Sequence, residues 1–253
     1  MRFTRLRDLR SADGHPVPAY LLEPERPAGG IALAHGYGGA KGYGGAKEQM
    51  LGLAAHLAEA GFAACCPDLR GHGEHPAPLG PGLLQDLEAA VGYCRRYGRV
   101  AALGHSLGGR LALMSSADLL IAVSPALPKR PSEEGRAMLV TFGSTAVRTP
   151  DPAAILPLLQ ALGPVPDSAR PKLLMVAEGD VPSLLEGVAE ASAALTAAER
   201  QVITRHQHRA GPLPQTIGAY LPHWFNHTDL KTNPEVAERV QAWLERRWGP
   251  KER

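Results

Sequence analysis

Short apolar runs alternate along this chain with segments whose apolar residues recur every three or four positions. Residues 3–10 and 16–23 flank the turn sequence Asp13-Gly14 and predict a two-stranded hairpin. Buried strands are predicted by the apolar runs at residues 30–34, 62–66, 100–103, 119–123, 173–176 and 201–204, and helices by the periodic segments at residues 48–62, 83–97 and 107–114. Because parallel strands need a crossover that a helix supplies, this alternation predicts an α/β fold. We expect a mostly parallel central sheet with helices on both faces.

Two segments interrupt the alternation. Residues 126–170 are rich in proline and contain one segment of helical character, residues 152–162. A connection of this length in a compact α/β domain is typical of a lid, so we expect a short lid or cap insertion at 126–170. Residues 207–222 are rich in glycine and proline without clear periodicity and are predicted to be a loop.

The chain closes with a well-signalled helix. Asn233 is placed as its N-cap, Pro234 stands in the first turn, and Glu235 lies near the positive end of the helix. Apolar residues then fall on one face, at Val236, Val240, Trp243 and Leu244. The segment is therefore predicted to pack one side against the core.

Composition narrows the class of protein. With 253 residues, 44% of them apolar and 21% charged, the chain is expected to form one domain, residues 1–253. The net charge of +2 is spread over both signs with no basic run, which argues against nucleic acid as a partner. No segment reaches the length of a membrane span, the N-terminus lacks the apolar core of a signal peptide, and the three cysteines form no disulfide framework, so we expect a cytoplasmic protein.

The candidate nucleophile lies in the sequence GHSLGG at residues 104–109. It fits the pattern G-x-S-x-G between a predicted strand and a predicted helix, which is the context that a nucleophile elbow requires. The glycines two positions before and after Ser106 are needed where backbone segments approach so closely that a Cβ atom would clash. The bend would place the Ser106 hydroxyl at the helix N-terminus, where the unpaired N–H of Leu107 can face an oxyanion.

Several motifs in order carry a family resemblance. HGYGG at residues 35–39, PDLRGHGEH at 67–75, GHSLGG at 104–109, VAEGD at 176–180 and the closing helix resemble the α/β-hydrolase family, particularly its esterase and lysophospholipase-like or serine-aminopeptidase-like members. The resemblance covers nearly the whole chain and implies the α/β-hydrolase fold. Its motifs identify a fold and a mechanism rather than a substrate.

The glycine-rich repeat GYGGAKGYGGAK, residues 36–47, is interpreted through this resemblance. The family's loop after the third strand carries the second oxyanion N–H just past a His-Gly pair, which makes Tyr37 the donor by position; Tyr43 in the second copy is the alternative. The repeat fits neither phosphate-binding motif, because no lysine follows a glycine as in a P-loop and the Rossmann pattern G-x-G-x-x-G ends in lysine. No nucleotide or other cofactor is expected.

The acid and the base follow the serine in the order that the family implies. Asp180 ends the strand in LLMVAEGD, at the family's position for the acid, whereas Asp151 and Asp167 lie in the insertion. His227 precedes the final helix and is chosen as the base. The alternatives His208 and His223 stay open, because His208 lies closer to the last strand. His223 and His227 are spaced like a metal pair, but the glutamate of H-E-x-x-H is missing, so no metal is expected.

Together these residues predict a serine hydrolase of carboxylesterase-like type, with a small-molecule ester as substrate and an acyl-enzyme intermediate. Peptidase, thioesterase and acyltransferase activity would use the same triad and stay open, as does the oligomeric state, a homodimer included. A non-catalytic binding protein of the same fold is the alternative from another class. It is disfavoured because a binding protein has no need of all five residues Ser106, Asp180, His227, Tyr37 and Leu107 together.

Overall fold

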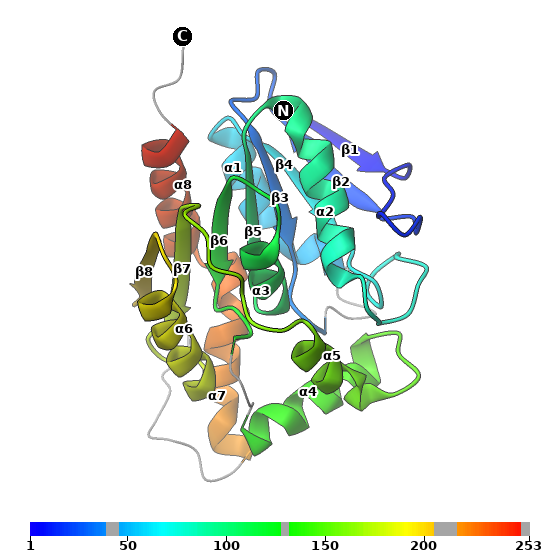
Figure 1. Ribbon diagram of the computed structural model, residues 1–253, viewed down its shortest axis with the longest axis vertical. Helices are drawn as coiled ribbons and strands as arrows, with labels where there is room; N and C mark the ends of the chain where they lie inside the picture. The colour runs from blue at the N-terminus through cyan, green and yellow to red at the C-terminus, as the bar shows by residue number, and fades with distance from the viewer. Residues whose placement is uncertain (39–45, 128–131, 205–216, 249–253) are drawn as a thin grey trace.

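A computed structural model describes residues 1–38, 46–127, 132–204 and 217–248. Within these ranges the strands form one mixed sheet in the order β1-β2-β4-β3-β5-β6-β7-β8 (Figure 1). The strands are β1 (Arg2–Leu6), β2 (Ala19–Glu23), β3 (Gly30–Ala34), β4 (Ala63–Pro67), β5 (Val100–His105), β6 (Leu119–Val123), β7 (Lys172–Ala177) and β8 (Ala198–Ile203). Strand β2 is antiparallel to both of its neighbours, and the pairs from β4 through β8 are parallel. The predicted hairpin and the mostly parallel sheet are confirmed.

Helices cover both faces of the sheet, as the sequence predicts. The helices are α1 (Leu51–Glu59), α2 (Leu83–Cys94), α3 (Leu107–Met114), α4 (Glu133–Ala146), α5 (Ile155–Ala161), α6 (Pro182–Ala194), α7 (Ile217–Asp229) and α8 (Pro234–Trp248). One core cluster joins α1 and α8 to one face, and a second joins α2, α3 and α6 to the other. Full burial of a large side chain such as Trp243 of α8, which is 0% exposed, stabilises the fold by about 2–3 kcal/mol.

The remaining helices, α4, α5 and α7, lie together beyond one end of the sheet (Figure 1). Helices α4 and α5 belong to the segment between β6 and β7. The periodic segment at 152–162 is confirmed as a 3₁₀ turn followed by α5, while α4 is an addition to the prediction. The predicted N-cap of α8 is also confirmed, because the Glu235 amide donates to Asn233 Oδ1 at 2.9 Å.

The prediction of a loop over 207–222 is wrong for its second part. Residues 205–216 lie outside the described residues, but α7 already begins at Ile217. Gly218 and Pro222 are both poor helix formers, so local propensity gives no helix signal here. Hydrogen bonds to the ends of neighbouring strands hold this helix instead, and they belong to the candidate site described next.

Candidate active site

Ser106 stands in a sharp turn between β5 and α3. Its backbone has φ 54° and ψ −115°, a left-handed conformation that costs a residue with a side chain about 1–3 kcal/mol. The turn is held from both sides, because the Ser106 amide donates to Val123 O at 2.9 Å and its carbonyl accepts from Arg110 and Ala126. The predicted elbow therefore forms, with Ser106 directly at the N-terminus of α3.

The flanking glycines are required by close packing of the backbone. A Cβ atom at Gly104 would lie 2.1 Å from the Gly108 carbonyl oxygen, and one at Gly108 would lie 2.3 Å from that of Ala34. Such distances are far below van der Waals contact. A Cβ at Gly36 would lie 3.3 Å from the Ser106 Cβ, so the His-Gly pair after β3 also packs against the elbow. These contacts confirm the reason given for the glycines of the motif.

Asp180 and His227 meet at the ends of β7 and α7. His227 Nδ1 lies 3.2 Å from Asp180 Oδ1. His227 is 2% exposed to solvent and Asp180 is 0% exposed. A carboxylate can only accept, so the Nδ1 nitrogen must carry the proton, which leaves Nε2 as the basic nitrogen. The fold therefore brings together two residues that are 47 positions apart in the sequence.

Ser124 is a third member of this contact that the sequence analysis did not find. Its hydroxyl donates to Asp180 Oδ2 at 2.5 Å and lies 2.9 Å from His227 Nδ1. With its proton directed to Asp180, the oxygen accepts from His227, so the imidazole N–H is shared between a carboxylate and a hydroxyl. Ser124 follows β6, is 0% exposed and has φ 45°. The available signal in the sequence is a polar residue directly after a buried strand that pairs with β5.

Helix α7 is anchored so that His227 faces these partners. His105 Nε2 donates to the His227 carbonyl oxygen at 2.8 Å, and their rings lie 4.6 Å apart. Asn226 donates to Gly179 O at 3.1 Å on the other side. The alternative base His223 contacts the backbone carbonyl of Asp180 rather than its carboxylate. The other alternative, His208, lies outside the described residues.

The two predicted oxyanion donors lie on either side of the elbow. Leu107 is the first residue of α3, so its N–H has no partner within the helix. Tyr37 follows the Gly36 that packs on Ser106, and neither amide donates to another of the described residues. The next amide, that of Gly38, is held by His72 Nε2 at 3.3 Å. Tyr43, the alternative donor, lies outside the described residues.

The two copies of the repeat have different surroundings at their described ends. The first copy begins at the elbow, whereas the second ends at Lys47, which is 1% exposed. The Lys47 ammonium contacts Asp68 Oδ2 at 2.6 Å and Glu74 Oε2 at 2.9 Å. Burial opposes the charge, but these hydrogen bonds outweigh it and raise the pKa of Lys47. Lys47 is therefore an internal ion-pair partner.

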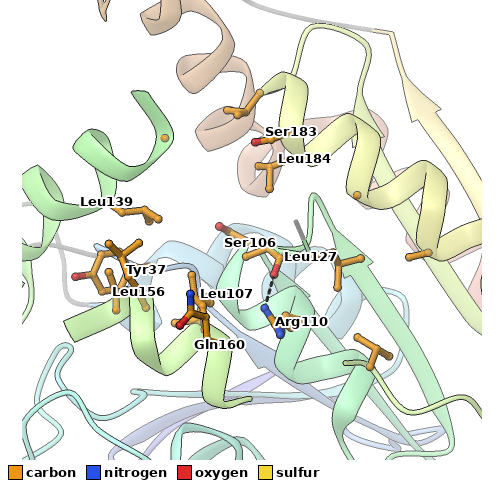
Figure 2. A pocket seen from close by; sticks show the side chains of 18 of the residues that line it. Tyr37, Ser106, Leu107, Arg110, Leu127, Leu139, Leu156, Gln160, Ser183 and Leu184 are labelled. Carbon is orange, nitrogen blue, oxygen red and sulfur yellow. Dashed lines mark hydrogen bonds between the residues drawn. The ribbon is translucent and has the colours of Figure 1, made fainter. Parts of the chain in front are cut away.

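A cavity of about 960 Å³ opens above the elbow (Figure 2). Ser106, His227, Tyr37 and Leu107 all line it. Most of the remaining wall is apolar and comes from α4, α5 and α6, including Leu139, Ile155, Leu156, Leu159, Leu184 and Ala191. The hydrogen bonds among described residues do not include one between Ser106 and His227. Such contacts often tighten only when substrate binds.

Other features add no further group to this site. Within the described ranges, no cluster of three or more His, Cys, Asp or Glu side chains is arranged to hold a metal ion. The described helices include none that is both long and apolar enough to cross a membrane. Cys65, Cys66 and Cys94 are free and buried, and burial raises the pKa of Cys66 well above its usual value. These thiols are part of the core.

Comparison with known proteins agrees with this geometry. A scan against protein-family models matches residues 31–252 to the alpha/beta hydrolase family. A search of the curated proteins gave no match to this chain. Solved structures of similar fold include a thermophilic esterase from Thermogutta terrifontis, at 15% identity and a TM-score of 0.64, with 98% of this chain and 100% of that chain covered.

Two more structures have comparable similarity. An esterase from Pyrobaculum calidifontis is 18% identical with a TM-score of 0.63, covering 97% of this chain and 86% of its own. A serine hydrolase from Xanthomonas campestris, described as having no lid, is 16% identical with a TM-score of 0.58, covering 100% of this chain and 98% of its own. At these identities the similarity is one of fold.

Proposed function

Because the chain belongs to the alpha/beta hydrolase family, we propose that it is a serine hydrolase that cleaves a carboxylic ester at Ser106. The membership supports an enzyme of the hydrolase class, as the sequence predicts. The observation that carries the finer proposal is the arrangement at one cavity. A strained serine and a histidine line it together, and the Nδ1 of that histidine faces a buried carboxylate.

Each residue has a role in this proposal. His227 Nε2 accepts the proton of the Ser106 hydroxyl while the oxygen attacks the ester carbonyl. Asp180 keeps the proton of His227 on Nδ1 and stabilises the imidazolium that forms. The amides of Tyr37 and Leu107 donate to the oxyanion of the tetrahedral intermediate. The intermediate collapses as His227 returns the proton to the leaving alcohol.

The acyl-enzyme is then hydrolysed by the same groups. His227 takes a proton from water, the hydroxide adds to the acyl carbonyl, and the Ser106 oxygen leaves with the proton that His227 returns. Ser106 rather than Ser124 is assigned as nucleophile, because Ser106 lines the cavity while Ser124 is 0% exposed on the acid side of His227.

The segment 126–170 fits the role of a lid in this proposal. Its helices α4 and α5 contribute apolar side chains to the cavity, among them Leu139 and Leu156. An apolar wall beside the nucleophile suits the carbon chain of a small-molecule ester and excludes water from the oxyanion. The esterases among the similar structures support the ester class. Peptidase, thioesterase and acyltransferase activity stay alternatives, and the cytoplasmic location and a homodimer stay predictions.

Hydrolysis of simple esters by wild type and by Ser106→Ala tests this proposal. With p-nitrophenyl acetate, butyrate and octanoate, we expect wild type to turn over at least one ester, and Ser106→Ala to lose about 10³-fold or more in kcat. Near-UV circular dichroism would establish that the variant keeps its packing. Turnover that survives in folded Ser106→Ala would refute the nucleophile. A folded wild type inert toward all three esters and toward acyl transfer would favour the non-catalytic alternative.

A further inference from the structure

One charged side chain in the cavity wall is not used by the proposed mechanism. Arg110 lies one helical turn after the nucleophile, where its amide donates to Ser106 O at 3.1 Å. Its side chain lines the same cavity as Ser106, and the residue is only 8% exposed (Figure 2). The guanidinium donates to Ala126 O, and the Ala126 amide donates to Ser106 O at 3.0 Å, so a single residue connects this cation to the nucleophile.

The guanidinium has fewer partners than it has donors. It donates to the backbone carbonyls of Ala126 at 3.2 Å and Gly163 at 2.5 Å, and both of these residues also line the cavity. Its Nε–H is buried without an acceptor in the part of the chain that the structure describes. The two Nη nitrogens each use one N–H on these carbonyls and carry a second one, so two N–H groups remain available to a bound group.

The positive charge of Arg110 also lacks an ion-pair partner within the described ranges. The ion pairs formed among the described residues do not include Arg110, and its burial alone lowers the pKa of this residue. Two other charged residues line the cavity, Arg136 and Glu190, and both are exposed to solvent. Arg110 is therefore the charge in this wall that solvent screens least, and burial of an unpaired charge is costly.

We propose that Arg110 is a substrate-binding residue that recognises a carboxylate, so that the natural substrate is an ester carrying an anionic carboxylate a few carbon atoms from the scissile carbonyl. This inference rests on the proposed function. A planar guanidinium matches a carboxylate in shape, and the pair forms charge-assisted hydrogen bonds. The apolar wall would hold the carbon chain between the two ends, with the ester carbonyl at Ser106 and the carboxylate at Arg110.

The preference of the enzyme for an anionic ester over a neutral one tests this inference. We would measure kcat/KM at pH 8 for the monomethyl and dimethyl esters of succinate, glutarate and adipate. Wild type should prefer at least one monoester over its diester by about tenfold or more. In Arg110→Met this preference should fall at least tenfold, with an intermediate value in Arg110→Lys, which keeps the charge but loses the planar fork.

A matched control separates the site from the general charge of the cavity. Arg136→Met removes the exposed arginine of the same wall and should leave the preference within about twofold of wild type. An equal loss of preference in Arg136→Met and Arg110→Met would contradict the assignment to Arg110. So would a wild type that prefers the neutral diester throughout the series, a result that needs no variant.

A binding measurement keeps this inference distinguishable from the proposed function. Calorimetric titration of Ser106→Ala with glutarate and with glutaramide requires no turnover. We expect glutarate to bind at least tenfold more tightly than the neutral diamide. This difference should be lost in Ser106→Ala/Arg110→Met and should be intermediate in Ser106→Ala/Arg110→Lys, which keeps the charge. Glutarate binding with no ester hydrolysis in wild type would refute the hydrolase and retain the anion site. Ester hydrolysis with equal binding of both compounds would refute the anion site alone.

Discussion

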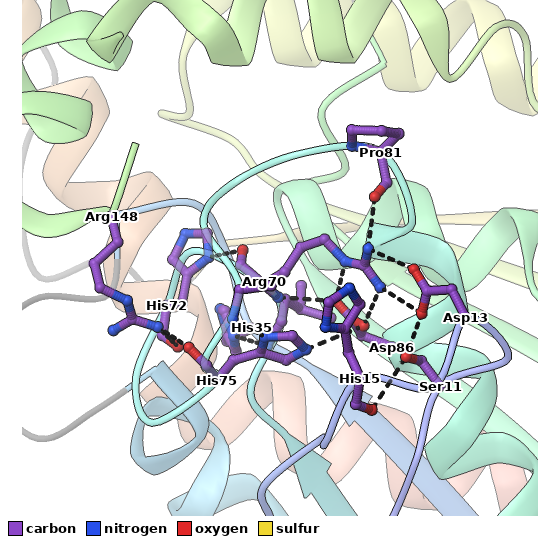
Figure 3. Close-up of polar contacts among 12 residues, drawn as sticks. Ser11, Asp13, His15, His35, Arg70, His72, His75, Pro81, Asp86 and Arg148 are labelled. Atoms are coloured by element: carbon purple, nitrogen blue, oxygen red, sulfur yellow. Dashed lines mark hydrogen bonds and ion pairs between the residues drawn. The ribbon is translucent and has the colours of Figure 1, made fainter. Parts of the chain in front are cut away.

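Two buried arginines of this protein have opposite surroundings. Arg70, 4% exposed, donates to both oxygens of Asp86 at 2.7 and 2.9 Å and to Asp13 Oδ2 at 2.8 Å (Figure 3). Arg110, 8% exposed, has two backbone carbonyls and no carboxylate among the described residues. The first charge is neutralised within the fold, whereas the second faces a cavity beside the candidate nucleophile.

This difference extends to the groups around each arginine. The Arg70 region ties the loop that follows β4 to the N-terminal turn and to α2, and its hydrogen bonds join protein to protein. Around the cavity, by contrast, the amides of Tyr37 and Leu107 have no acceptor among the described residues, and the Arg110 guanidinium donates only to two backbone carbonyls. Unpaired donors destabilise a folded chain unless a ligand uses them. The contrast separates groups that hold the fold from groups that we propose to act on substrate.

The largest effect should come from removing the paired arginine. Arg70→Met leaves Asp86, 0% exposed, without its guanidinium, so the free energy of unfolding should fall by about 3–5 kcal/mol. Arg110→Met removes an unpaired charge along with two hydrogen bonds to carbonyls. It should change the free energy of unfolding by about 1 kcal/mol or less. Urea denaturation of both variants measures this. Equal losses of stability would mean that Arg110 is structural, like Arg70.

Acid should destabilise the fold through two buried histidines, His35 and His72. His35 Nε2 accepts from the Leu69 amide and His72 Nε2 accepts from the Gly38 amide, so both imidazoles are held neutral. Burial lowers the pKa of His35 to about 4 and that of His72 to about 3. Below pH 6.5 the unfolded chain binds protons that the folded chain does not, so stability is present above that pH and is lost as the pH falls.

Each histidine should contribute about 1.4 kcal/mol of lost stability per pH unit between roughly pH 6 and 4.5. Carboxylates whose pKa is lowered, such as Glu74 beside Lys47, add their loss only nearer to pH 4 and below. Urea denaturation at pH 7.5, 6.5, 5.5 and 4.5 would follow this loss. A free energy of unfolding that stays level across this range would contradict the account of the two histidines.

A smaller effect on stability, with a distinct effect on rate, is expected from Ser124→Ala. The variant removes a hydrogen bond to Asp180 and one from His227, at a cost of about 1–2 kcal/mol in the free energy of unfolding. As a positioning residue, Ser124 should lower kcat about tenfold to a hundredfold without raising KM. Complete loss of turnover in Ser124→Ala, together with unchanged turnover in Ser106→Ala, would identify Ser124 as the nucleophile.

The sequence predicts the parts of this protein whose signals are local. Apolar runs predict the buried strands, and the glycines within residues 104–109 predict the elbow. Helix α7 could not be predicted, because Gly218 and Pro222 oppose it and its support comes from β5 and β7. Ser124 could not be predicted for a related reason: its hydroxyl reaches Asp180 and His227 only because the fold brings the ends of β6 and β7 together with α7. The sequence marks Arg110 only as one more residue of a helix, because the absence of an ion-pair partner among the described residues is a property of the fold.

The most direct test of the central claim is the site of covalent labelling by a fluorophosphonate. Intact mass measurement followed by peptide mapping identifies the serine that His227 activates, without any assumption about the natural substrate. We expect one adduct per chain, on Ser106, and no adduct in Ser106→Ala. An adduct on Ser124, or a folded protein that takes up no label, would contradict the assignment of Ser106 as the nucleophile.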